Sequence, residues 1–233
     1  MNKKFMKVMA LSMAVMTSAA VFASCGKDGS GATETNGGTT GGDSTATAFK
    51  IGCIGPATGD AAIYGKAVFN GIQIAVDEIN AKGGSIKFEF KSEDDVADGE
   101  TAVNAYNTLV DWGMQALVGP VTTGSSIAVS AKTAEDKMFM LTPSGSSTYI
   151  IKDKDNVFQV CFTDPNQGTG SADYIAEHMA DKKVAIIYRN DDAYSQGIRD
   201  TFVAEAATKS IEVVYQGTFT KDTATDFSVQ LTA

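Results

Sequence analysis

The sequence contains little of the residue types on which metal binding and nucleophilic catalysis most often depend. Its 233 residues include one histidine and three cysteines, and no two cysteines form a CxxC pair. One histidine leaves little material for a zinc site or for a Ser-His-Asp triad. Three cysteines are also too few for a disulfide scaffold. We therefore expect no metal site, no cofactor and no catalytic residues.

Basic side chains are scarce relative to acidic ones. The chain has 19 Lys and Arg against 28 Asp and Glu, which gives a formal net charge of -9 at pH 7. A nucleic-acid-binding protein needs a basic face to meet phosphates, so this balance argues against a nucleic-acid partner. A hydrophobic share of 43% argues against wholesale disorder. The length suits one large globular domain or two small ones.

One long uncharged segment, residues 8–23, follows a start that carries three lysines among its first seven residues. This segment is too short and too rich in small residues for a transmembrane span and is typical of a signal peptide, which we place at residues 1–24. It ends in Phe22-Ala23-Ser24-Cys25, which resembles the lipobox of bacterial lipoproteins. That resemblance implies a lipid on Cys25. The alternative is ordinary signal cleavage with Cys25 incidental.

The next segment, residues 26–47, has no large apolar side chain. It contains seven Gly and eight Ser or Thr among 22 residues, a composition that forms a flexible coil. We therefore interpret residues 25–48 as a lipidated cysteine followed by a flexible linker. This interpretation predicts an exported protein, lipid-anchored to the outer face of the bacterial cytoplasmic membrane, or else periplasmic.

From residue 49 onward, apolar strand patterns alternate with helical ones. Strands are expected at 49–55, 86–90, 116–119, 138–142, 157–162, 184–188 and 211–215. Helices are expected at 68–79, 103–110, 125–136, 168–180 and 198–206, with another beginning near 226. Asp164-Pro165 is read as the end of the fifth strand. Such alternation predicts an α/β fold with parallel sheets, in which ligands bind beyond the carboxyl ends of the strands.

Two of the expected strand-end loops are rich in small hydroxyl side chains. Residues 120–126 read Pro-Val-Thr-Thr-Gly-Ser-Ser and residues 143–147 read Pro-Ser-Gly-Ser-Ser. Hydroxyls and backbone N–H groups at a helix N-terminus suit a carboxylate. The alternative is that these residues only cap helices and form turns. Three acids at positions 94, 95 and 98 could serve an enzyme, but acids after a strand are more often solvated or capping groups.

The chain then shows a specific family resemblance. Residues 50–84, KIGCIGPATGDAAIYGKAVFNGIQIAVDEINAKGG, look like the opening of the Leu/Ile/Val-binding proteins of ABC importers. Later stretches fit the same family, namely YNTLVDWGMQALVGPVTTGSS, FMLTPSGSS, FTDPNQG and VAIIYRNDDAYSQG. The likeness covers residues 49–233. It implies a type I periplasmic-binding-protein fold, with two Rossmann-like lobes that close on an amino acid.

The resemblance also implies boundaries and site residues. Lobe 1 would be residues 49–163 and lobe 2 residues 164–233, and the family's greater length implies that lobe 2 is incomplete and the sequence truncated at its carboxyl end. The implied ligand-binding residues are Tyr64, Thr123, Ser144, Gly145, Ser146 and Tyr194. Tyr64 would flank the ligand side chain, and Tyr194 would reach across from lobe 2. The acid that meets the ligand ammonium in the family is expected beyond residue 233.

The function implied is that of a binding protein rather than an enzyme. Its ligand would be leucine, isoleucine, valine or a similar small neutral amino acid, and its partners the permease subunits of an ABC importer in the membrane. The alternative is an extracellular ligand-sensing module of a signalling receptor, which uses the same fold.

Overall fold

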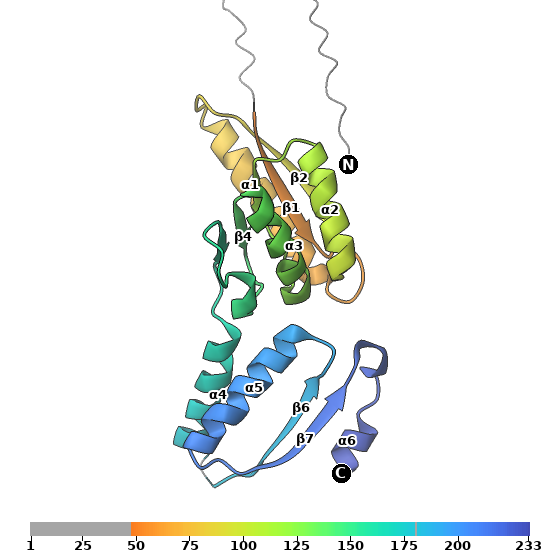
Figure 1. Ribbon diagram of the computed structural model, residues 1–233, viewed down its shortest axis with the longest axis vertical. Coiled ribbons are helices and arrows are strands. Elements are labelled where there is room, and N and C mark those ends of the chain that lie inside the picture. Colours follow the sequence, from red (N-terminus) through yellow and green to blue (C-terminus); the bar gives the residue numbers. More distant parts are fainter. Residues whose placement is uncertain (1–47, 180) are drawn as a thin grey trace, which may run out of the picture. The chain divides into compact units, whose positions relative to one another are not determined.

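The computed structural model describes residues 48–179 and 181–233. The predicted signal peptide, Cys25 and linker lie outside the described residues, except for residue 48. The elements follow one another as strands and helices in near-regular alternation (Figure 1). They are β1 (Phe49–Gly55), α1 (Ala62–Ala81), β2 (Phe88–Asp94), α2 (Gly99–Asp111), β3 (Ala116–Val118), α3 (Thr123–Asp136), β4 (Met140–Thr142), η1 (Thr148–Ile150), β5 (Val157–Gln159), α4 (Asp164–His178), β6 (Val184–Arg189), α5 (Ala193–Thr208), β7 (Val213–Phe219), η2 (Lys221–Thr223) and α6 (Ser228–Thr232).

The strands form two parallel sheets. The first sheet has the order β2-β1-β3-β4-β5, and the second pairs β6 with β7. The predicted α/β class with parallel sheets is confirmed. All strands of one sheet end at the same edge, so the loops after β1, β3 and β4 gather there.

Helices cover both faces of the first sheet. A side chain added at Gly52 of β1 would meet Leu109 of α2, whereas one added at Gly55 would meet Phe69 of α1. Residues an odd number of positions apart on a strand point to opposite faces, so α1 and α2 lie on opposite sides of β1. This arrangement leaves the strand ends, rather than the sheet faces, free to form a site.

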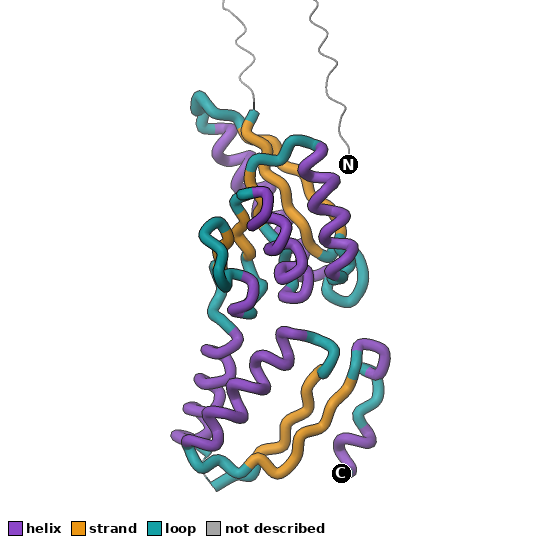
Figure 2. Tube along the Cα trace, viewed as in Figure 1, coloured by secondary structure: helices purple, strands orange, loops and turns teal. Residues whose placement is uncertain are grey.

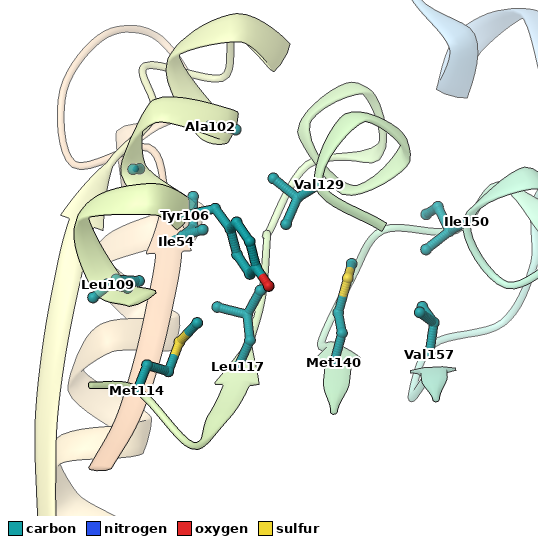
Figure 3. Packing of buried hydrophobic residues seen from close by; sticks show 11 residues of the cluster. Ile54, Ala102, Tyr106, Leu109, Met114, Leu117, Val129, Met140, Ile150 and Val157 are labelled. Atoms are coloured by element: carbon teal, nitrogen blue, oxygen red, sulfur yellow. The ribbon is translucent and has the colours of Figure 1, made fainter. Parts of the chain in front are cut away.

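The main core lies between the first sheet and the helices α2 and α3. Tyr106 from α2, Val129 from α3 and Met140 from β4 meet there, and each is at most 1% exposed (Figure 3). The Tyr106 hydroxyl donates to Asp136 Oδ2 at 2.8 Å, which satisfies its polar end. The core therefore holds α3, and with it the start of that helix, firmly against β4.

A smaller core lies in the part that contains the second sheet. Helices α4 and α5 lie side by side (Figure 2), and Ala172, Phe202 and Ala206 form their buried contact. No helix in residues 48–179 and 181–233 is both long and apolar enough to cross a membrane.

One helix start differs from the prediction for a clear reason. The sequence predicts that Asp164-Pro165 ends a strand, but α4 begins at Asp164 and β5 already ends at Gln159. Proline is favoured in a first helical turn because its missing N–H would be unpaired there anyway. An aspartate in that turn also meets the positive end of the helix dipole. The prediction that Asp164-Pro165 closes a strand is therefore wrong.

Other boundaries shift by a few residues. Helix α3 begins at Thr123 instead of residue 125, so Thr123 belongs to the first helical turn rather than to the loop. The last strand lies at Val213–Phe219 instead of 211–215. The first strand, Phe49–Gly55, is confirmed.

Candidate ligand-binding site

A cleft of about 900 Å³ is lined by strand-end loops that follow both sheets. Five of the six predicted ligand-binding residues line it, namely Tyr64, Thr123, Ser144, Ser146 and Tyr194. A second hollow of about 440 Å³ lies against β6 and α5 and has mostly aliphatic and aromatic walls. We place the candidate site in the larger cleft because polar groups from separate elements converge there.

Thr123 and Ser144 present different groups to the cleft. Thr123 Oγ1 accepts a hydrogen bond from the backbone N–H of Ser146 at 3.2 Å, and no residue within 48–179 and 181–233 accepts its own proton, which can be donated to a ligand. Ser144 Oγ instead donates to the carbonyl oxygen of Val121 at 2.6 Å. Its proton is therefore already used, and the Ser144 side chain can only accept from a ligand.

Gly145 does not line the cleft. Its N–H donates to Thr142 Oγ1 at 2.9 Å, and its carbonyl accepts from Gln159 Nε2 at 2.8 Å. A methyl group on Gly145 would lie 2.7 Å from Ser126 Oγ, which leaves no room for a side chain. In this structure Gly145 shapes the loop between Ser144 and Ser146.

Ser146 is joined to a buried acid. Its hydroxyl donates to Asp164 Oδ1 at 2.6 Å, and the Asp164 N–H donates to the Ser146 carbonyl at 3.0 Å. Both residues are 2% exposed. The Ser146 proton is thus directed away from the cleft, and the oxygen lone pairs remain for a ligand.

The two tyrosines come from different elements. Tyr64 lies in the first turn of α1 and is 66% exposed, and Tyr194 lies in the first turn of α5. The Tyr194 hydroxyl donates to Gln167 Oε1 at 3.2 Å. Burial, and then the charges of Asp164 and Asp192, raise the pKa of Tyr194. The hydroxyl therefore stays protonated at neutral pH.

The three acids considered as catalytic candidates, Asp94, Asp95 and Asp98, instead accept hydrogen bonds from backbone N–H groups. Asp98 caps α2, accepting from the Thr101 N–H at 2.8 Å. Asp94 and Asp95 accept from the N–H groups of Val96 and Ala97, both at 2.9 Å, and so hold two residues of left-handed backbone beside the cleft. Their geometry fits the capping interpretation rather than an acid–base pair.

Sequence reasoning missed several polar residues on the wall from the second sheet. Arg189 Nε pairs with Asp191 Oδ1 at 2.6 Å, and the Lys221 N–H donates to Asp191 Oδ2 at 3.1 Å. Asp192 caps α5 by accepting from the Ser195 N–H at 3.0 Å. Arg189 is the last residue of β6, and Asp191 and Lys221 each lie two residues beyond the end of β6 and of β7, so a place at a strand end is a signal for all three. Lys221 was missed because the predicted last strand ended at residue 215 instead of at Phe219.

The two cysteines in the described residues differ in exposure. Cys53 in β1 is fully buried, and burial raises its thiol pKa well above the usual value. Cys161 lines the cleft and is only partly buried, and its Sγ donates to the Gly145 carbonyl at 3.3 Å. Burial also raises the pKa of Cys161. Neither thiol is activated for nucleophilic chemistry. No group of three or more potential metal-ligating side chains occurs within residues 48–179 and 181–233.

The described part of the chain is similar to a known protein family. Residues 48–233 match the family described as periplasmic binding protein. The chain belongs to that family. Because the match spans all described residues, it includes both sheets and both walls of the cleft.

Individual relatives carry related names. The chain is 40% identical over 157 residues to the Leu/Ile/Val-binding protein BraC3 of Rhizobium johnstonii, covering 66% of this chain and 42% of the relative. It is 37% identical over 186 residues to Leu/Ile/Val-binding protein homolog 3 of Brucella melitensis, covering 78% and 50%. The chain thus spans about half the length of the curated relatives it matches.

A solved structure confirms the predicted type I periplasmic-binding-protein fold. The branched-chain amino acid transporter substrate binding protein LivJ from Streptococcus pneumoniae, in complex with isoleucine, superposes with a TM-score of 0.74. The two sequences are 32% identical, and the match covers 79% of this chain and 53% of that one.

Proposed function

We propose that this protein is the extracytoplasmic substrate-binding component of an ABC importer. Its ligand in this proposal is leucine, isoleucine, valine or a similar small neutral amino acid, held in the cleft between two lobes at 49–163 and 164–233. The names of the relatives and the isoleucine bound to the similar structure support this ligand class. The proposed role is binding and delivery to permease subunits, not catalysis.

The observation that carries the proposal is the opposite hydrogen-bonding polarity of two cleft side chains. Thr123 Oγ1 accepts from the Ser146 N–H and can donate its own proton to a ligand, whereas the Ser146 hydroxyl already donates its hydrogen bond to Asp164. An α-amino acid likewise presents one acceptor group, its carboxylate, and one donor group, its ammonium. The carboxylate therefore fits Thr123 and the ammonium fits Ser146.

The start of α3 adds to the carboxylate side of this site. Thr123 is the first residue of the 14-residue helix, and the first N–H groups of a helix have no partner within it. These N–H groups and the helix dipole together favour an anion. A carboxylate can thus be held without an arginine on this wall.

The proposed mechanism is ligand-induced closure of the cleft, whose two walls follow different sheets. A ligand that contacts both walls binds the closed form more tightly than the open form, and so shifts the population towards closure. The closed form would then present both lobes to the permease.

The ligand titration that tests this function uses the purified, intact protein. We expect saturable heat when L-leucine is added and none when L-arabinose is added. Loss of leucine uptake in cells lacking the gene would support an importer, whereas unchanged uptake with altered signalling would support the sensor alternative. Absence of heat with L-leucine, L-isoleucine and L-valine would contradict the proposed ligand class.

Tyr64→Ala should weaken L-leucine binding by about tenfold and leave the Tm of the ligand-free protein nearly unchanged. Tyr64 is 66% exposed in the ligand-free protein, so it contributes little to folding stability. Covering its ring with a bound ligand would contribute roughly 1–2 kcal/mol to the binding free energy. Tyr149 is 65% exposed and does not line the cleft, so Tyr149→Ala is the matched control. Equal effects of the two substitutions on L-leucine affinity would show that Tyr64 does not contact the ligand.

We also propose that Cys25 carries a lipid that anchors the protein, in line with the lipobox-like residues before it. Cells grown with radiolabelled palmitate should label the protein and retain it in the membrane fraction. Cys25→Ser should abolish both, and Cys161→Ser should change neither. Labelling that persists in the Cys25→Ser variant would contradict the anchor.

A further inference from the structure

Asp164 is a buried acid that no ligand-binding role yet explains. It is the first residue of α4 and is 2% exposed, and it does not itself line the cleft. It reaches the cleft wall only through Ser146, whose hydroxyl and carbonyl it binds at 2.6 and 3.0 Å. The acid thus stands directly behind a predicted ligand-binding residue.

The second oxygen of this carboxylate, Oδ2, is buried without a hydrogen-bond partner among the described residues. Within the described part of the chain, Asp164 Oδ2 has no hydrogen-bond partner and no ion pair involves Asp164. Helix α5 packs tightly against it, since a methyl group on Gly197 would lie 2.7 Å from Oδ2. Burial raises the pKa of Asp164, the Ser146 hydrogen bond opposes this, and Asp192 adds to it. A buried charge without a partner lowers stability, so its presence calls for a compensating benefit.

Asp164 determines the direction in which the Ser146 hydroxyl donates its hydrogen bond. An ionised carboxylate has no proton and can only accept, so it fixes the Ser146 proton on the side away from the cleft. Towards the cleft, Ser146 Oγ then offers only lone pairs. A neutral residue in place of Asp164 would let the hydroxyl turn and donate, which would suit a second carboxylate as well as an ammonium.

We infer that Asp164 is a positioning residue that selects ligands with a free α-ammonium group, by fixing the direction of the Ser146 hydroxyl. This inference rests on the proposed function, because it assigns a specificity role within the same cleft. The ammonium group of a bound ligand would also supply the positive charge that the hydrogen-bonded pair of Ser146 and Asp164 lacks. Asp164 thereby sets the preference of the cleft for an ammonium group, although it does not contact the ligand itself.

Asp164→Asn is the first test, with L-leucine as the probe in calorimetry. Asparagine keeps the shape but can donate as well as accept, so it no longer fixes the direction of the Ser146 proton, and it removes the charge. We expect L-leucine affinity to fall by about tenfold or more, the loss typical of a charge-assisted hydrogen bond. The Tm of the ligand-free protein should stay the same or rise, because an unpaired buried charge is gone. Asp173→Asn, an exposed acid on the same helix, is the matched control and should leave L-leucine affinity unchanged.

A double-variant cycle separates positioning from a general structural effect. In a Ser146→Ala background, Asp164→Asn should change L-leucine affinity by less than about twofold, because its intermediary is absent. The variant Gly197→Ala disturbs the same carboxylate from α5 while leaving its charge in place, and it should also weaken L-leucine binding. It keeps the test decisive if Asp164→Asn does not fold.

The outcomes are distinguishable. No heat with branched-chain amino acids in the unsubstituted protein would overturn the proposed function and this inference with it. Binding by the unsubstituted protein, with affinity retained within twofold in Asp164→Asn, would overturn the inference alone. An equal loss in the Ser146 and Ser146→Ala backgrounds would also overturn it. If Asp164→Asn does not fold, unchanged affinity in Gly197→Ala would do so.

Discussion

Thr123→Val should weaken L-leucine binding by about a hundredfold. Valine removes the hydroxyl proton proposed to meet the ligand carboxylate, a hydrogen bond to a charged group worth about 1.5–3 kcal/mol. It also removes the oxygen that accepts the Ser146 N–H at 3.2 Å, which leaves a buried donor unpaired at a cost of about 1–3 kcal/mol. Together these losses affect both the ligand contact and the loop that carries Ser146. Calorimetric titration with L-leucine measures the effect.

Thr133→Val is the matched control for this substitution. Thr133 lies on the same helix, is fully buried, and donates its hydroxyl proton to the Ser130 carbonyl at 3.1 Å. Its loss should lower stability to a similar degree but leave L-leucine affinity near that of the unsubstituted protein, because it does not line the cleft. If both valine variants bind L-leucine equally well, the carboxylate does not meet Thr123.

Gly168→Ala should lower the free energy of unfolding by about 3 kcal/mol. In the packed helices α4 and α5, a methyl group at this position would lie 2.6 Å from the Phe202 backbone nitrogen and 2.7 Å from the Ile198 carbonyl. Backbone atoms cannot rotate aside, so the two helices would have to separate. That separation would also displace Asp164 and Tyr194, which these helices carry at their first turns.

Gly170→Ala is the control two residues further along α4. No atom lies within 4 Å of a methyl group there, so the substitution gains only helix propensity and should raise stability by up to about 1 kcal/mol. Urea denaturation of the two variants should therefore show shifts of opposite sign. Shifts of the same sign and size would mean that α4 and α5 are not in contact at Gly168.

Local patterns predicted most of the fold. The apolar run at Phe49–Gly55 and the helix that ends before Gly83 depend on neighbouring residues only, and the structure has both. The start of α4 was missed because Asp164-Pro165 suits the end of a strand as well as the first turn of a helix. The helix start is fixed in part by hydrogen bonds between Ser146 and Asp164, which lie 18 residues apart and could not be read from neighbouring residues.

The candidate site divides in the same way. Hydroxyls after β3 and β4 could be recognised, since the topology of parallel strands places such loops together. Whether each hydroxyl can donate to a ligand or only accept from it could not be predicted, because that depends on which protein group accepts its hydrogen bond. Ser144 donates its hydrogen bond to the Val121 carbonyl oxygen and Ser146 donates to the Asp164 carboxylate, and neither partner is adjacent in sequence. Gly145 shares the same short loop, yet its backbone faces Thr142 and Gln159 rather than the cleft.

A crystal structure of the protein with L-leucine bound would test the proposed site directly. We expect leucine in the cleft, with its carboxylate at hydrogen-bond distance from Thr123 Oγ1 and its ammonium at hydrogen-bond distance from Ser146 Oγ. Leucine bound elsewhere, or bound in the cleft with its carboxylate on Ser146 and its ammonium on Thr123, would show that the proposed site is wrong.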